Sequence, residues 1–197
     1  MIDLSNTIFI LDGSSDIHSV RQKIQKEYHC TPEFRKASCN GKDVSPEGYV
    51  NAVTGTLMLA LSGSYRHIIC IFDREKRQMS SQNLRAKVKG VIVTKLLETN
   101  QYSKTELSEK VYVFVPDIML ENWIVADVQG IKLKKELIRQ NAKQEKYDGK
   151  SGSTTLKRMM KTNYHKTQHA PLLFKAVNFK RASINSPSFE AFYTALE

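Results

Sequence analysis

Three short segments of the chain are almost wholly apolar, and segments in which apolar residues recur every three or four positions lie between them. The apolar runs are typical of strands buried on both faces, and they cover residues 7–11, 68–72 and 111–115. Residues 33–39 are a candidate for one more short strand. The pattern between these strands predicts helices over residues 17–28, about 45–61 and about 84–99. Because strands alternate with helices, we expect βαβ units. The pattern predicts an α/β fold with a mainly parallel four-stranded sheet flanked by helices.

Acidic residues follow the predicted strands. Asp12 ends the first strand and precedes Gly13, which is expected to give the turn unusual backbone angles, and Ser14 or Ser15 is expected to cap the next helix. The third strand runs into Asp73-Arg74-Glu75, where an i, i+2 spacing directs two carboxylates to one side of an extended chain. Taken alone, that segment is more typical of a strand followed by a charged turn than of a cation site. The carboxyl ends of parallel strands share one sheet edge, so these acids are expected to gather there.

Several carboxylates at one edge repel one another unless their pKa values rise or a cation binds. We therefore predict a Mg²⁺ or Mn²⁺ site, with Asp73 and Glu75 as ligands. Asp12 would be a ligand or a general acid or base. Asp16 and Glu121, which follows the fourth strand, would support these residues or hold a second ion.

The net charge of +10 is unevenly distributed. Residues 1–127 contain 16 Lys and Arg against 15 Asp and Glu, whereas residues 128–197 contain 14 against 5. We expect a catalytic domain over residues 1–130 and a basic helical region over 131–197 that packs on it. Such a surface favours binding to a nucleic-acid backbone, although a solvated helical face would have the same composition. The expected phosphate contacts are Lys157, Arg158, Lys161, Lys166, Lys180 and Arg181.

Within the basic region, helices are predicted over about 154–162, 170–178 and 187–196, after a flexible loop at 148–153. Tyr164, Phe174 and Phe179 are more typical of a core than of base stacking. His165 and His169 have the i, i+4 spacing of zinc ligands, but no acid is near them and Pro171 is expected to end their helix.

Other classes of site are not supported. The Gly-Lys-Ser at 149–151 lacks the first Gly of a P-loop, and neither a G-x-S-x-G elbow nor a G-x-G-x-x-G fingerprint occurs. Three cysteines without a CxxC pair indicate reduced thiols. Since no apolar run is long enough to span a bilayer and Asp3 is unlike a secretory leader, we expect a cytoplasmic protein without membrane contact. A homo-oligomer is compatible with the sequence.

The strand-end acids resemble those of the Toprim fold, the catalytic domain shared by topoisomerases, primases and several small nucleases. In that family one strand ends in an acid and Gly, usually Glu-Gly, with another acid a few residues on, and a later strand ends in Asp-x-Asp. Here the corresponding residues are Asp12-Gly13 with Asp16, and Asp73-Arg74-Glu75. Asp12 is one methylene shorter than the usual Glu.

The likeness extends over nearly the whole chain to the RloB-like branch of small Toprim proteins from bacterial defence islands. Members of that branch carry an acid just before a Trp, as in Glu121-Asn122-Trp123, and end with an Arg and a Ser-x-Ser-Phe-like helix start, as in Arg181 and 186–189. The resemblance implies a Mg²⁺- or Mn²⁺-dependent phosphodiesterase that cuts DNA or RNA, including tRNA. It also implies an effector of anti-phage defence that works with a partner ATPase.

A different class of function is also compatible with the sequence. In it, the chain is a catalytically inert Toprim-like module that binds nucleic acid or a partner ATPase as a regulator. Primase or topoisomerase action comes last, because both need additional domains.

Overall fold

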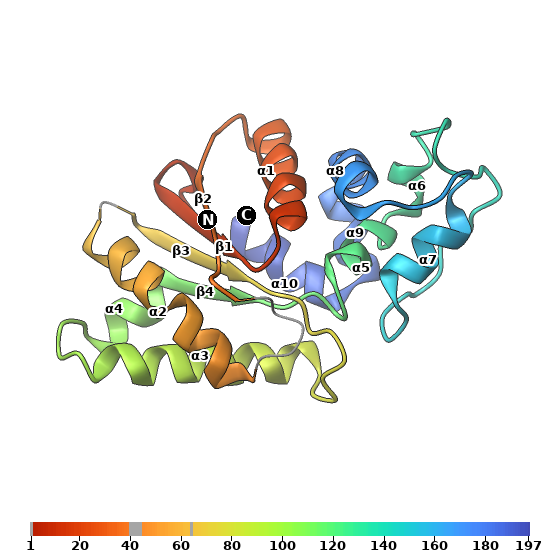
Figure 1. Ribbon diagram of the computed structural model, residues 1–197. Helices are drawn as coiled ribbons and strands as arrows, with labels where there is room; N and C mark the ends of the chain where they lie inside the picture. Colours follow the sequence, from red (N-terminus) through yellow and green to blue (C-terminus); the bar gives the residue numbers. More distant parts are fainter. Residues whose placement is uncertain (1, 40–44, 64) are drawn as a thin grey trace.

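The structure is a computed structural model that describes residues 2–39, 45–63 and 65–197. The described residues form one parallel sheet flanked by helices (Figure 1), as the sequence predicted. The predicted turn at Asn40-Gly41 lies outside the described residues. The strands are β1 (Thr7–Leu11), β2 (Glu33–Lys36), β3 (His67–Ile71) and β4 (Val111–Phe114). The helices are η1 (Leu4–Asn6), α1 (Ser14–Tyr28), α2 (Pro46–Ser62), α3 (Ser81–Leu97), α4 (Lys104–Lys110), α5 (Leu120–Val125), α6 (Val128–Ile131), α7 (Gly152–Met159), α8 (Lys166–Ala176), α9 (Phe179–Asn185) and α10 (Pro187–Leu196).

The sheet has the strand order β2-β1-β3-β4. From β1 the chain passes through α1 to β2 on one side, and it then returns through α2 to β3 on the other side of β1. The strand order therefore reverses between β1 and β3, which is the position where open α/β sheets bind their ligands. Ile8 pairs with Ile68 and Leu11 with Ile71, so both strands end level with each other.

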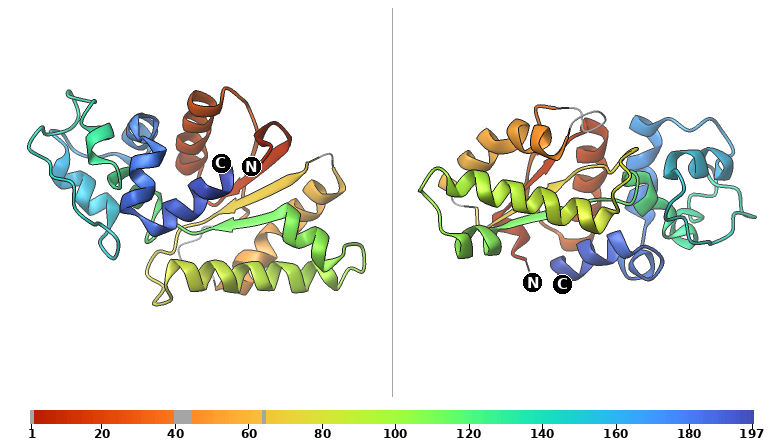
Figure 2. Two further views of the ribbon diagram at one scale, coloured as in Figure 1. Left: turned by 180° about the vertical axis from the view of Figure 1, so that it is seen from behind. Right: turned by 90° about the horizontal axis from the view of Figure 1, so that it is seen from below.

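Side chains of the central strands alternate between two hydrophobic cores, which explains why the apolar runs are continuous. Phe9 and Leu11 face the core covered by α1 and the C-terminal helices. Ile8 and Ile10 face the core covered by α2, α3 and α4 (Figure 2). Burial of each such side chain stabilises the fold by roughly 1.5–3 kcal/mol.

The C-terminal helices complete the first of these cores. The Trp123 ring of α5 stacks on Phe192 of α10 at 4.9 Å between centroids, and Phe192 meets Phe114 of β4 edge-on at 5.3 Å. The α10 helix thus returns to the sheet, and the two ends of the chain lie side by side (Figures 1 and 2). The basic region and the sheet share a core, and Trp123 is the packing anchor that its sequence position predicted.

The turn after β1 differs from the prediction. Gly13 has an extended backbone, with φ of −120° and ψ of 138°, and it is itself the residue before α1 without a side-chain cap. Glycine is required here because the Asp16 side chain lies close to the Gly13 backbone, and a Cβ at this position would clash with Oδ2 of Asp16. The glycine makes room for a carboxylate rather than for an unusual backbone angle.

The other helical predictions were partly wrong. The α3 helix is present but begins at Ser81, slightly before the expected position, and the α4 helix was missed. Pro171 lies inside α8, where buried Leu173 and Phe174 in the next turn stabilise a helix that lacks one backbone hydrogen bond. None of the described helices has the length and apolar character needed to cross a membrane.

Residues 148–153 are held in place instead of forming a flexible loop. The Asn122 amide donates to the carbonyls of Tyr147 and Lys150, at 3.3 and 2.8 Å, and its Oδ1 accepts from the N–H of Gly152 at 3.2 Å. The start of α7 therefore packs directly against α5.

Candidate acidic site

Four carboxylates gather at the carboxyl edge of the sheet. Asp12 follows β1 and Asp73 follows β3, on either side of the topological switch point. Asp16 lies in the first turn of α1, where the helix dipole favours an anion, and Glu121 lies in the first turn of α5. Their exposed fractions are 8%, 6%, 5% and 1%, respectively. The fold thus buries four acids from three separate segments in one place.

Lys166, the first residue of α8, lies among these acids. Its Nζ is 2.9 Å from Oδ1 of Asp16 and donates a hydrogen bond to Oδ2 of the same residue at 3.2 Å. It is also 3.8 Å from Oδ2 of Asp73 and 3.6 Å from Oε2 of Glu121. One ammonium group therefore contacts carboxylates from α1, the end of β3 and α5. We call Asp12, Asp16, Asp73, Glu121 and Lys166 the acidic cluster.

Burial and mutual repulsion change the proton affinities in the cluster. Burial raises the pKa of Asp12, and burial with the charge of Asp16 raises the pKa of Asp73 well above its ordinary range. Burial also raises the pKa of Asp16 to about 6, although Lys166 acts in the opposite direction. For Lys166, burial lowers the pKa, but Asp73, Asp16 and Glu121 outweigh it, so the pKa of the ammonium rises. Lys166 stays charged, while the pKa values of Asp16 and Asp73 are held above their ordinary range.

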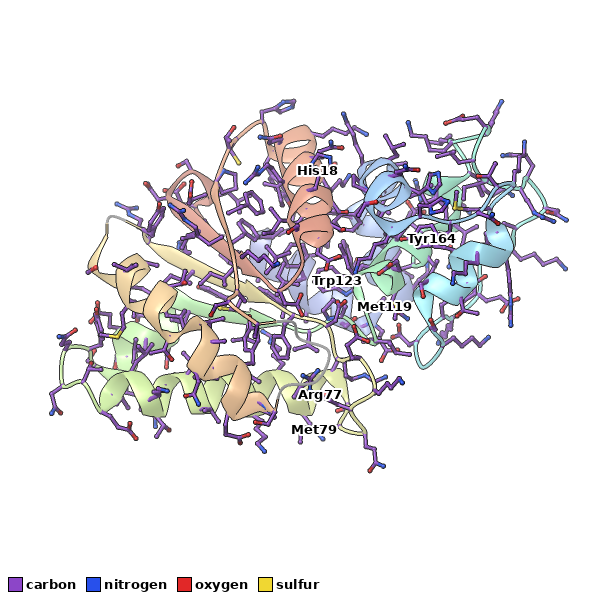
Figure 3. The ribbon with its side chains drawn as sticks, viewed as in Figure 1. His18, Arg77, Met79, Met119, Trp123 and Tyr164 are labelled. Carbon is purple, nitrogen blue, oxygen red and sulfur yellow. The ribbon has the colours of Figure 1, made fainter. Side chains whose placement is uncertain are left out.

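Tyr164 fixes one member of the cluster. Its hydroxyl donates to Oε1 of Glu121 at 3.0 Å, and burial raises its pKa, so it stays protonated as a donor. Tyr164 lies among the C-terminal helices (Figure 3). This aromatic residue packs against the first core, as expected, and its hydroxyl also orients a carboxylate.

The cluster has donor atoms suited to a hard cation, although they are not arranged as a ready coordination set. Oδ1 of Asp16 and Oε2 of Glu121 are buried and accept no hydrogen bond from the part of the chain that the structure describes. Carboxylate oxygens are the ligands that Mg²⁺ and Mn²⁺ prefer. Across residues 2–39, 45–63 and 65–197, no three His, Cys, Asp or Glu side chains already converge on a metal position. The donor chemistry fits such a cation, while Lys166 lies where the oxygens converge.

Glu75 lies apart from the contacts of Lys166. The β3 strand ends at Ile71, so Asp73 and Glu75 belong to a turn in which Glu75 has a left-handed φ of 53°. The two-residue alternation of a strand does not continue through such a turn. The Glu75 N–H donates to the carbonyl of Ile118 at 2.7 Å, and the Glu75 charge helps to raise the pKa of Asp12. Glu75 is therefore a half-buried residue of the turn after β3 whose charge acts on Asp12, outside the ion pairs of Lys166.

Arg74 holds the turn after β3 against the loop after β4. Its Nε donates to the carbonyl of Asp117, its Nη2 lies 3.4 Å from Oδ1 of Asp117, and its Nη1 donates to the carbonyl of Arg77 at 2.8 Å. Arg77 lies on the loop that follows β3 (Figure 3). This bracing fixes the backbone that carries Asp73.

The six basic residues predicted to bind phosphates have three different environments. Lys157 and Arg158 on α7, Lys161 after it and Lys180 on α9 are exposed. Lys166 belongs to the acidic cluster. Arg181 makes a two-pronged salt bridge with the buried Asp127, at 2.9 Å from Nε and 3.0 Å from Nη2. The exposed residues remain available to a phosphate backbone, whereas Arg181 joins α9 to the start of α6.

The fold and site define an α/β protein whose parallel sheet carries a buried acidic cluster at its switch point. The chain belongs to the DUF4276 family, because the model of this family, described as a domain of unknown function, matches residues 8–197. The match includes both the strand-end acids and the C-terminal region that supplies Lys166. The comparisons with curated proteins and with solved structures found no match.

Proposed function

We propose that this protein is a divalent-cation-dependent nuclease, in which the acidic cluster binds Mg²⁺ or Mn²⁺ and a phosphodiester of DNA or RNA is hydrolysed. The observation that carries the proposal is the convergence of four buried carboxylates at the switch point of the sheet. A cluster with this many like charges is costly unless cations or protons compensate it. Binding a divalent cation would supply that compensation.

The residues of the chain would share the work. Asp16, Asp73 and Glu121 would hold the cation, which supplies charge neutralisation of a phosphodiester oxygen and activation of water when bound. Asp12 has a raised pKa and is the most exposed of the four buried acids, and it would accept or donate a proton. Tyr164 would keep Glu121 oriented.

The exposed basic residues of the C-terminal region would hold the nucleic-acid backbone. Three of them, Lys157, Arg158 and Lys161, are exposed and lie on α7 or just after it. Their binding would be sequence-independent and salt-sensitive. The resemblance to RloB-like Toprim proteins places such a nuclease, with a partner ATPase, in anti-phage defence, and tRNA is among its candidate substrates.

The test is cleavage of mixed tRNA, single-stranded DNA and duplex DNA by the purified protein with Mg²⁺, Mn²⁺ or EDTA. Asp73→Asn should reduce the rate by about 100-fold or more, since it removes a charge from the cluster. Glu75→Gln should reduce it less, because Glu75 lies outside the ion pairs of Lys166. Glu98→Gln, at an exposed residue directly after the end of α3, is the matched control. Metal-independent products, or full activity of Asp73→Asn, would contradict the proposal.

A second candidate is an inert module that binds nucleic acid or a partner ATPase as a regulator. The contacts of Lys166 and Tyr164 favour it, because they offer the carboxylates partners within the chain. For this candidate we expect no cleavage of any substrate, with or without the ATPase, and unchanged activity of Asp73→Asn in cells.

A further inference from the structure

Lys166 has an unfavourable position for its own helix. It is the first residue of α8, and a cation at a helix N-terminus is disfavoured by the helix dipole. The first turn of α8, all of whose residues are described, holds no acidic side chain, and the preceding His165 gives no side-chain cap. Local helix preferences therefore do not explain a lysine here. What offsets the cost is contact with three carboxylates from outside α8.

The Lys166 ammonium also contacts the carboxylate oxygens that a divalent cation would need as ligands. Its Nζ is 2.9 Å from one buried oxygen without a hydrogen bond, Oδ1 of Asp16, and 3.6 Å from the other, Oε2 of Glu121. Mg²⁺ binds carboxylate oxygens at roughly 2.0–2.1 Å, so an ion shared by these two oxygens would lie in the space of the ammonium. Two cations cannot occupy that space together.

We infer that Lys166 is a built-in counter-cation of the acidic cluster, and that a divalent cation binds by displacing its ammonium. The inference rests on the proposed function only for the binding of a cation to the cluster, and it does not require cleavage. Competition follows because the ammonium and the metal would be attracted by the same carboxylates and would repel each other. Without the metal, Lys166 prevents three buried acids from repelling one another.

Displacement of Lys166 would also move part of the basic region. The segment just before it carries Tyr164, which is hydrogen-bonded to Glu121, and the helix that follows packs along α1. Release of the ammonium would free the start of α8 from the sheet edge.

The first experiment measures Mg²⁺ and Mn²⁺ affinity by isothermal titration calorimetry for the wild type, Lys166→Met and Lys161→Met. Methionine keeps most of the length of the side chain and removes its charge, and exposed Lys161 is the matched control. We expect Lys166→Met to bind the cation at least about 10-fold more tightly than the wild type, which corresponds to about 1.4 kcal/mol. Lys161→Met should change the affinity by less than about 2-fold. Equal or weaker binding by Lys166→Met, or no binding by either protein, would overturn the inference.

The second experiment needs no variant, so it does not depend on how Lys166→Met folds. The wild type is treated briefly with an amine-reactive reagent at constant pH, with Mn²⁺ or with EDTA, and modified lysines are counted by mass spectrometry. Labelling of Lys166 relative to Lys161 should rise severalfold with Mn²⁺, because the ammonium has left its three carboxylates. An unchanged ratio would contradict displacement. A protein that passes both tests but cuts no nucleic acid retains the inference and loses the proposed nuclease function.

Discussion

Replacement of Arg181 by Ala should destabilise the fold without weakening contact to nucleic acid. From its sequence position, this residue was predicted to bind phosphates. In the structure its guanidinium is paired with Asp127, whose side chain is 1% exposed. A guanidinium engaged in a two-pronged carboxylate contact is not free to bind a phosphate in the same way.

The size of the stability loss depends on the hydrogen bonds that Asp127 would keep in the variant. Its oxygens accept four hydrogen bonds, two from Arg181 and two from the N–H groups of Gly130 and Asn178, at 3.1 and 2.6 Å. Loss of one partner of a fully buried ion pair costs roughly 3–5 kcal/mol. The Arg181 side chain is 42% exposed, so water can replace part of the contact, and the backbone donors remain. We therefore expect a loss of about 2 kcal/mol, or a fall in Tm of about 4–8 °C for a chain of this size.

Urea denaturation and the salt dependence of nucleic-acid binding together test this prediction. The matched control is Arg158→Ala, which removes an exposed guanidinium from α7. The control should leave stability within about 0.5 kcal/mol and should reduce the slope of log K against log salt by about one. Arg181→Ala should show the opposite combination, with lower stability and an unchanged slope. A stable Arg181→Ala protein whose slope falls like that of the control would refute the structural role.

Two further predictions concern the turn that carries the cluster. Gly13→Ala should lower the cation affinity measured by calorimetry, because the new Cβ displaces the Asp16 carboxylate; equal affinity of the variant and the wild type would contradict this prediction. The control is Gly90→Ala, since a Cβ at this position of α3 meets open space. It should stabilise the fold by about 0.5–1 kcal/mol in urea denaturation. The Asp16 pKa of about 6 lies above its ordinary 3.8, so Asp16 favours folding below pH 3.8 and loses that contribution as pH rises through about 6. In EDTA, the stability of the wild type relative to Asp16→Asn should therefore fall between pH 4 and 7, and a pH-independent difference would count against the assigned burial.

The sheet and part of the site could be predicted because their signals are local. A run such as Ile68–Phe72 is apolar at every position only when both faces of the strand are covered, and the structure covers it with two cores. Parallel pairing then brings Asp12 and Asp73 to one edge, whatever the details of the helices. The positions of these two residues could be predicted from strand order and chain direction alone.

The partner of the acids could not be predicted in the same way. Lys166 is 150 positions from Asp16 and is one of 14 Lys and Arg residues in the segment 128–197, so composition does not distinguish the lysine that folds back onto the sheet. The distinguishing signal is weak: a lysine at the start of a helix without an acid in the first turn. The position of Glu75 could not be predicted from the strand pattern, since a rule for strands does not extend into a turn with positive φ.

The short α5 helix explains why the acidic cluster and the basic region belong to one body. All six of its residues are buried, which for a helix with polar side chains requires a partner for each polar group. Glu121 reaches Lys166 and Tyr164, Asn122 anchors the start of α7, and the Trp123 indole N–H donates to the hydroxyl of Ser188 at 3.0 Å at the start of α10. Consecutive residues thus connect the site, the basic helix α7 and the helix that returns to the sheet. A shift of Glu121 on cation binding would therefore be transmitted through this rigid turn to α7, whose exposed basic side chains are the proposed contacts to nucleic acid.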